Sequence, residues 1–169
     1  MKFDIARQPL VPAFMTLFAL AVAAMCAGIP VSDTSGAVRD ALPLLGGQLA
    51  RFQAAYPVWS KFAAGFMLLF TGMCAGRITI RYNLYTVGTC LPIPLYAIVA
   101  CGIATGGNYL AGFAASMLLA LATKNYCRAF CNGYGFDAIF RASLYLGLMP
   151  LIYAPALPLL LLLPLAVLL

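Results

Sequence analysis

Four basic residues occur as two pairs, and the members of each pair are four residues apart in the sequence. The pairs are Arg77 with Arg81 and Lys124 with Arg128. Residues four apart share one side of a helix, and guanidinium groups bind phosphate oxygens in a bidentate geometry. The four residues therefore predict a site for an anionic head group, such as that of a phospholipid or a polyprenyl phosphate. Ordinary anchoring by basic residues at a membrane surface is the alternative interpretation.

Asp137 and Arg141 form a further pair with the same spacing of four residues. Their side chains can form an ion pair on a helix. Because ionisable residues inside a membrane are costly and often functional, we take them as a candidate intramembrane ion pair that serves a head group or a translocated proton. An interfacial pair that anchors the start of a helix is the alternative.

Two residue types that are common in active sites do not occur in the sequence, which contains no histidine and no glutamate. A Ser-His-Asp triad, a HExxH zinc site and a glutamate general base are therefore excluded within this chain. Cys127 and Cys131 are four apart, but without histidine or further closely spaced thiols they do not predict a zinc site. We expect no metal and no cofactor, we assign no catalytic residue, and we leave open whether the protein is an enzyme.

The composition indicates the solvent that surrounds these residues. Hydrophobic residues make up 64% of the 169 residues and charged residues 8%, against roughly 45–50% and about 25% in soluble globular domains. So few charged side chains cannot cover a water-soluble surface. The lysines and arginines stand singly between apolar runs, unlike the clustered basic face of a nucleic-acid-binding protein. We therefore expect an integral membrane protein with membrane lipids as partners and no nucleic acid.

The apolar runs predict an all-α fold, a polytopic transmembrane bundle of about six spans in a single domain. A span needs about 20 apolar residues to cross a hydrocarbon core about 30 Å thick. The spans are expected at 10–29, 62–75, 85–103 and 109–122, with two more in segment 138–169 on either side of a break at 153–155. The first could instead be a signal peptide. Pro92 and Pro94 are expected to break or kink the third.

Between the first two spans, the spacing of apolar residues predicts an amphipathic helix. Apolar residues recur at alternating spacings of four and three from Val38 to Tyr56, with charged and amide residues between them. Such a helix lies in the membrane interface or packs against the spans. Pro43 and the Gly46-Gly47 pair indicate that it is broken or kinked.

The positive charges predict the orientation of the spans. Basic residues gather in cytoplasmic loops of inner-membrane proteins. Six spans that begin inside place Lys2, Arg7, Arg77, Arg81, Lys124, Arg128 and Arg141 on the cytoplasmic side, and Arg39, Arg51 and Lys61 outside. The sequence therefore predicts a multi-pass protein of the bacterial inner membrane with a cytoplasmic N-terminus.

Two short segments resemble an uncharacterised family of Bacteroidetes multi-pass inner-membrane proteins. They are Thr-Cys-Leu-Pro at 89–92 and Gly-Leu-Met-Pro-Leu-Ile-Tyr-Ala-Pro at 147–155, the latter preceded by Phe-Asp-Ala at 136–138. The order and spacing of the spans are similar too, although Arg141 stands where the family is more often apolar. Members of the family are longer, so the resemblance implies that this chain is the N-terminal half of a longer protein. The apolar final residues, which have no basic flank, lead to the same expectation. The resemblance implies no activity.

Three functions fit these observations. The best interpretation is a component of cell-envelope biogenesis that contacts lipid-linked or phospholipid substrates through Arg77, Arg81, Lys124 and Arg128. The alternatives are a transporter or channel subunit, with Asp137 and the proline-broken span lining a path, and a non-catalytic scaffold. The scaffold would assemble with partner membrane subunits or as a homo-oligomer through glycine-rich faces such as that of Gly72 and Gly76.

Overall fold

The fold is all-α, as the sequence predicts, and no strand occurs in the part of the chain that is described. The computed structural model describes residues 10–26, 44–82, 90, 92–104, 108–131 and 135–161. In chain order the helices are α1 (Leu10–Cys26), α2 (Leu44–Ala55), α3 (Pro57–Arg81), α4 (Pro92–Ala104), α5 (Tyr109–Cys131), α6 (Phe136–Ile152) and the 3₁₀ helix η2 (Ala154–Leu161). Lys2, Arg7, Arg39 and the segment at 162–169 lie outside the described residues.

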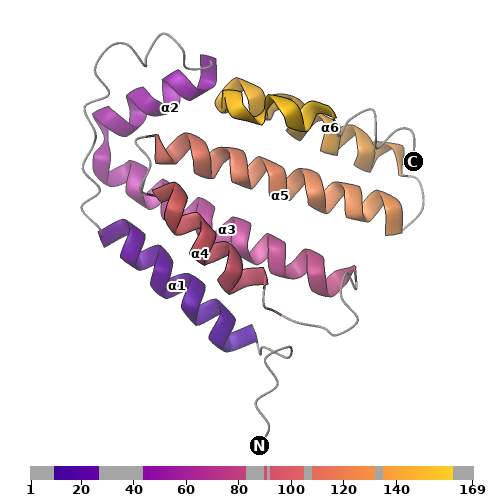
Figure 1. Ribbon diagram of the computed structural model, residues 1–169, viewed down its shortest axis with the longest axis horizontal. Coiled ribbons are helices and arrows are strands. Elements are labelled where there is room, and N and C mark those ends of the chain that lie inside the picture. Colours follow the sequence, from indigo (N-terminus) through magenta and orange to yellow (C-terminus); the bar gives the residue numbers. More distant parts are fainter. Residues whose placement is uncertain are drawn as a thin grey trace, which may run out of the picture.

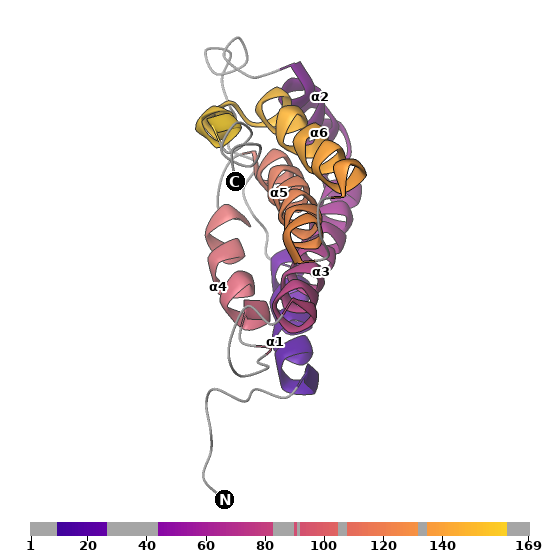
Figure 2. The same ribbon diagram turned by 90° about the vertical axis from the view of Figure 1, so that its right-hand side faces the viewer.

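The helices α1, α3, α5 and α6 form one layer (Figure 1). In Figure 1, α3 and α5 run side by side in the same direction, while α1 and α6 flank them and run the opposite way. Figure 2 shows α4 and η2 on one face of this layer. We call the end at which α3 and α5 begin the Tyr109 end, and the end at which they finish the Arg81 end.

A buried hydrogen bond joins the first turns of α3 and α5 at the Tyr109 end. The Ser60 hydroxyl and the Tyr109 hydroxyl lie 2.6 Å apart, and both residues are buried. Nearby, the side-chain oxygen of buried Gln53 in α2 accepts a hydrogen bond from the Leu110 N–H at 3.3 Å. That N–H belongs to the first turn of α5, where no intrahelical acceptor is available. The two bonds fix where α5 begins relative to α2 and α3.

Prolines stand at the start of two helices. Pro57 and Pro92 stand at the first positions of α3 and α4, where the missing N–H has no intrahelical partner in any case. Helix α4 thus begins at the first of the two prolines that are expected to break or kink the third span, while residues 83–89 and 91 lie outside the described residues. The predicted break at 153–155 is present, since α6 ends at Ile152 and η2 begins at Ala154.

Two helices are longer than the spans that their apolar runs predict. Helix α3 extends over 25 residues and α5 over 23, or about 37 Å and 35 Å at 1.5 Å per residue. Within the described residues, α3 is the one helix both long and apolar enough to cross a membrane, and α1 holds a shorter apolar stretch at Ala13–Val22. The predicted number of six spans stays a prediction.

Small side chains fill the interior, while many large ones lie on the outside. More than half of the buried hydrophobic residues are alanines, and most of the described phenylalanines are exposed. On α3, for example, Phe66 is 66% exposed whereas Leu68 is fully buried, and Phe62 shares the exposed side. Small residues between helices allow their backbones to approach closely.

The closest approaches occur at Gly72 and Gly76 of α3. A Cβ atom on Gly72 would lie 2.8 Å from the Leu17 methyl groups of α1. On Gly76 it would lie 2.5 Å from Cγ1 of Ile93 in α4. Because Leu17 and Ile93 are themselves buried, neither side chain has free space into which it can move. The glycine spacing in the sequence therefore marks the face of α3 that packs against α1 and α4.

We expect Gly76→Ala to destabilise the protein by about 1–3 kcal/mol, the usual cost of overpacking a filled interior. Thermal unfolding followed by circular dichroism in detergent micelles measures the change. Gly147→Ala is the matched control, because a Cβ atom there meets no atom within 4 Å. The control should be neutral or up to about 1 kcal/mol more stable, since alanine favours a helix over glycine. Equal effects of the two changes would contradict the close packing at Gly76.

Candidate functional site

A basic pocket lies at the Arg81 end, between α3 and α5. Its volume is about 440 Å³. The described residues that line it are Phe70, Cys74, Arg77, Ile78, Ile80, Arg81, Tyr82 and Lys124. Helix α3 supplies most of this lining from its last three turns, and α5 supplies the lysine across from it. We refer to this cavity as the basic pocket.

Three of the four basic residues predicted to form an anionic site line this pocket. They are Arg77, Arg81 and Lys124, which approach from two helices that are far apart in sequence. Arg128 is not among the lining residues, although all four basic side chains are exposed. It lies one turn, about 6 Å, beyond Lys124 along the helix axis. Arg128 shares a helix face with Lys124, but its side chain lies at a different height along the helix axis.

The pocket is positively charged, and no described carboxylate neutralises it. Within the described ranges the ion pair that forms is that of Asp137 and Arg141, which are not pocket residues. Three cations around one cavity, beside low-dielectric walls, concentrate a positive potential there. Such a pocket favours an anion, and the arginines can donate paired N–H groups to phosphate oxygens.

The pocket has an apolar wall beside its charges. Phe70 and the buried Ile78 line it together with the basic residues. Phe70, Cys74, Arg77 and Arg81 follow one another at spacings of four, three and four residues, which places them along one face of α3. The sequence analysis did not single out Phe70 and Cys74, although this spacing could have identified them. An apolar wall beside a cluster of cations matches a ligand in which an anionic group adjoins hydrocarbon.

The predicted pair of Asp137 and Arg141 forms in the first turns of α6. The Arg141 Nη2 atom lies 3.0 Å from Asp137 Oδ2, and its Nε donates to Oδ1 at 3.1 Å. The side chains are 71% exposed for Asp137 and 58% for Arg141. Asp137 also lies in the first turn of α6, where a negative charge interacts favourably with the helix dipole. Whether the pair lies inside a membrane stays a prediction.

We expect the coupling between Asp137 and Arg141 to be about 0.3–0.5 kcal/mol, as for other exposed pairs with this spacing. A double-mutant cycle with Asp137→Asn and Arg141→Gln, measured by thermal unfolding in detergent micelles, gives this value. Raising the salt concentration should weaken the coupling, because exposed charges are screened. A coupling of several kcal/mol that salt does not change would instead place the pair in a medium of low dielectric constant.

Comparisons with known proteins add no functional assignment to this geometry. The resemblance to a Bacteroidetes inner-membrane family is not tested by any match. No family model, no curated protein and no solved structure matches the chain.

Proposed function

We propose that the chain is a multi-pass inner-membrane protein that binds the phosphate group of a lipid in the basic pocket, on the cytoplasmic side. The observation that carries this proposal is the convergence of Arg77, Arg81 and Lys124 on one cavity beside an apolar wall. Basic residues that served only as surface anchors would have no reason to converge from two helices. A phosphate joined to a hydrocarbon chain satisfies both parts of the lining.

The distribution of large and small side chains supports a membrane location. In water, exposed phenylalanines along α3 and α6 would form an extensive apolar surface, which monomeric soluble proteins rarely carry. In a bilayer the same side chains face lipid at no cost. Helix association then depends on close contact between small residues, which here are the alanines and glycines of the interior.

The directions of the helices support the proposed orientation. Arg77, Arg81, Lys124, Arg128 and Arg141 belong to the parts of α3, α5 and α6 near the Arg81 end, whereas Arg51 and Lys61 belong to α2 and the start of α3. The positive-inside rule then makes the Arg81 end cytoplasmic. In this arrangement α1, α3, α4, α5, α6 and η2 are the six crossing segments, and α2 is the interfacial helix between the first two.

Among the described segments, α3 and α5 are longer than a hydrocarbon core of about 30 Å. At 1.5 Å per residue, α1 and α6 extend about 25 Å, and α3 and α5 extend further. The 13 residues of α4 reach about 20 Å, and η2 is shorter still. Short helices at membrane depth are tolerated where they line a cavity or are covered by protein. Both of these short helices lie on the same face of the helix layer (Figure 2).

Phosphate-bearing lipids at this membrane face include phospholipids and lipid-linked intermediates of the cell envelope. We therefore place the protein in cell-envelope biogenesis. No geometric feature favours a transport path through Asp137, because its carboxylate is exposed and already paired at the start of α6.

We expect Lys124→Gln to weaken the binding of phosphatidylglycerol about tenfold, which corresponds to a loss of about 1.4 kcal/mol. A titration followed by native mass spectrometry in detergent measures the affinity. Arg128→Gln is the matched control, since it removes one charge from the same helix outside the pocket. It should change the affinity by less than about twofold, as for an exposed charge. Equal losses would mean that net charge, and not the pocket, binds the lipid.

The orientation gives a separate prediction. The experiment expresses a cysteine-free variant in intact cells. Arg51→Cys in this background should react with a membrane-impermeant maleimide added outside. Arg128→Cys should react only after the membrane is permeabilised. The reason is that the two positions lie at opposite ends of the helix layer. Reaction of both from outside would refute the proposed topology while leaving the phosphate site open to test.

A further inference from the structure

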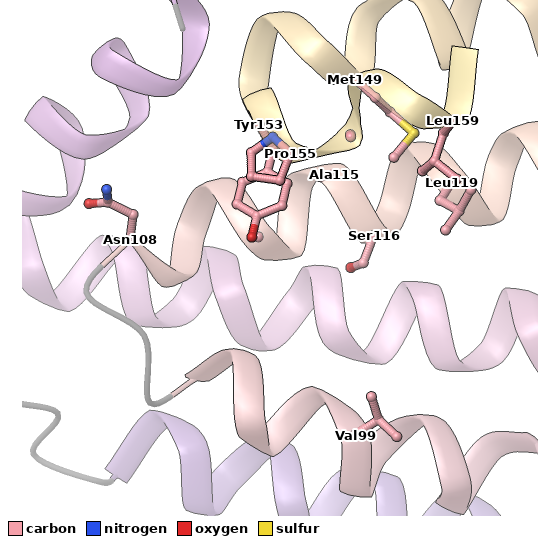
Figure 3. Close-up of a pocket in the computed structure, with 11 residues that line it drawn as sticks. Val99, Asn108, Ala115, Ser116, Leu119, Met149, Tyr153, Pro155 and Leu159 are labelled. Carbon is pink, nitrogen blue, oxygen red and sulfur yellow. The ribbon is translucent and has the colours of Figure 1, made fainter. Parts of the chain in front are cut away.

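A second cavity lies on the face of the helix layer that carries α4 and η2, and it shares no described lining residue with the basic pocket. Its volume is about 640 Å³, within the roughly 300–1,000 Å³ of small-molecule sites. Residues of α5, of α6 with η2, and Val99 of α4 line it (Figure 3). We call it the crevice.

One wall of the crevice is a row of positions along α5. Asn108, Gly112, Ser116 and Leu119 follow one another at spacings of four, four and three residues. The row from Asn108 to Leu119 is about 16 Å long at 1.5 Å per residue. The crevice therefore runs along the direction of the long helices. In the proposed membrane orientation it runs from one membrane surface into the hydrocarbon core.

The lining changes from polar to apolar along this direction. Asn108 and Tyr153 lie at the Tyr109 end of the crevice, and Leu119 and Leu159 lie toward its other end (Figure 3). Ser116 lies between these two groups. A lipid at a membrane surface has the same order, with its polar group at the interface and its chain deeper.

The polar groups at the Tyr109 end are free to bind a ligand. In the described part of the chain, no hydrogen bond forms to the Asn108 amide or the Tyr153 hydroxyl. Ser116, by contrast, is occupied, because its hydroxyl donates to the Phe113 carbonyl at 2.8 Å and lies 3.2 Å from the Tyr96 hydroxyl. The unused donors and acceptors thus gather where the polar group of a lipid would lie.

The described lining contains no charged residue. A phosphate or an ammonium group would have no counter-ion here, and unpaired charges are costly in an apolar site. An amide and a phenol can instead serve a neutral hydroxyl or ester group. This is the opposite of the lining of the basic pocket, so the two cavities select for different head groups.

We propose that the crevice binds a neutral, hydroxyl-bearing lipid such as a diacylglycerol, with one hydrocarbon chain along α5 and its glycerol group beside Asn108 and Tyr153. This ligand enters from the membrane face opposite the basic pocket. The inference rests on the membrane location in the proposed function. It does not depend on phosphate binding in the basic pocket.

The experiment uses the protein in phosphatidylcholine vesicles with a diacylglycerol that carries a diazirine at the end of one acyl chain. Val99→Trp fills the crevice from α4 and should lower photolabelling about tenfold. Ile98→Trp is the matched control and should label as the wild type does, because its side chain does not line the crevice. Both positions are well exposed, at 68% and 63%, so neither change disturbs the interior.

A second variant tests the polar end. Tyr153→Phe should lower photolabelling a few-fold by removing one hydroxyl, while leaving the unfolding temperature unchanged, because that hydroxyl makes no hydrogen bond in the described part. Unlabelled diacylglycerol should compete with the probe, and phosphatidylglycerol should not. Wild-type labelling of Val99→Trp, or equal competition by phosphatidylglycerol, overturns the inference.

The outcome is separable from that of the proposed function. Phosphatidylglycerol titration of the same variants reports the basic pocket, whose residues none of these substitutions touches. If Val99→Trp labels as the wild type does, while Lys124→Gln still weakens phosphatidylglycerol binding more than Arg128→Gln does, the crevice ligand alone is rejected. If Lys124→Gln and Arg128→Gln bind phosphatidylglycerol equally well, while Val99→Trp still lowers photolabelling, the phosphate site alone is rejected.

Discussion

The register between α3 and α5 determines where the basic side chains meet. The hydrogen bond between Ser60 and Tyr109 aligns the first turns of two parallel helices. From that bond, Arg77 lies 17 residues along α3 and Lys124 lies 15 residues along α5, or about 25 Å and 23 Å at 1.5 Å per residue. The two side chains therefore reach the same depth. A slip of one helical turn, about 5.4 Å, would separate them.

The polar bonds at the Tyr109 end help to hold this register, because more than half of the buried hydrophobic side chains are alanines. Alanines and glycines allow the backbones to come close, but they interlock weakly and do not by themselves specify one alignment. The Tyr109 hydroxyl meets Ser60, and the Leu110 N–H meets the Gln53 oxygen, in this alignment of the helices. Because these groups are buried, a shift that left the Tyr109 hydroxyl or the Leu110 N–H without a partner would be costly. Close packing thus holds the helices together, and hydrogen bonds select their alignment.

The sequence predicted the helical fold and the break before Ala154, and three of the four basic residues that it singled out line one pocket. Each of these observations depends on local patterns. The lengths of α3 and α5 were not predicted, since apolar runs report contact with lipid, whereas a helix continues as long as its backbone hydrogen bonds do. Pro92 stands at the first position of α4, where a proline is favourable. The position of Arg128 outside the pocket, and the existence of the crevice, were not predicted. Both depend on how far along each other the packed helices lie, and residue spacing within one helix does not determine this.

The proposed orientation and the proposed phosphate site both depend on the basic residues near the Arg81 end, but the two roles make different demands. Orientation depends on the number of positive charges near a membrane face and is indifferent to their mutual positions. Binding depends on their convergence and on the absence of carboxylates among them. Lys124 and Arg128 separate the roles, because both contribute equally to the charge of the Arg81 end while only Lys124 lines the cavity. If orientation were the sole requirement, lysines and arginines scattered over the ends of α3 and α5 would satisfy it. The convergence of Arg77, Arg81 and Lys124 beside Phe70 and Ile78 goes beyond what orientation requires, and the proposed phosphate site depends on it.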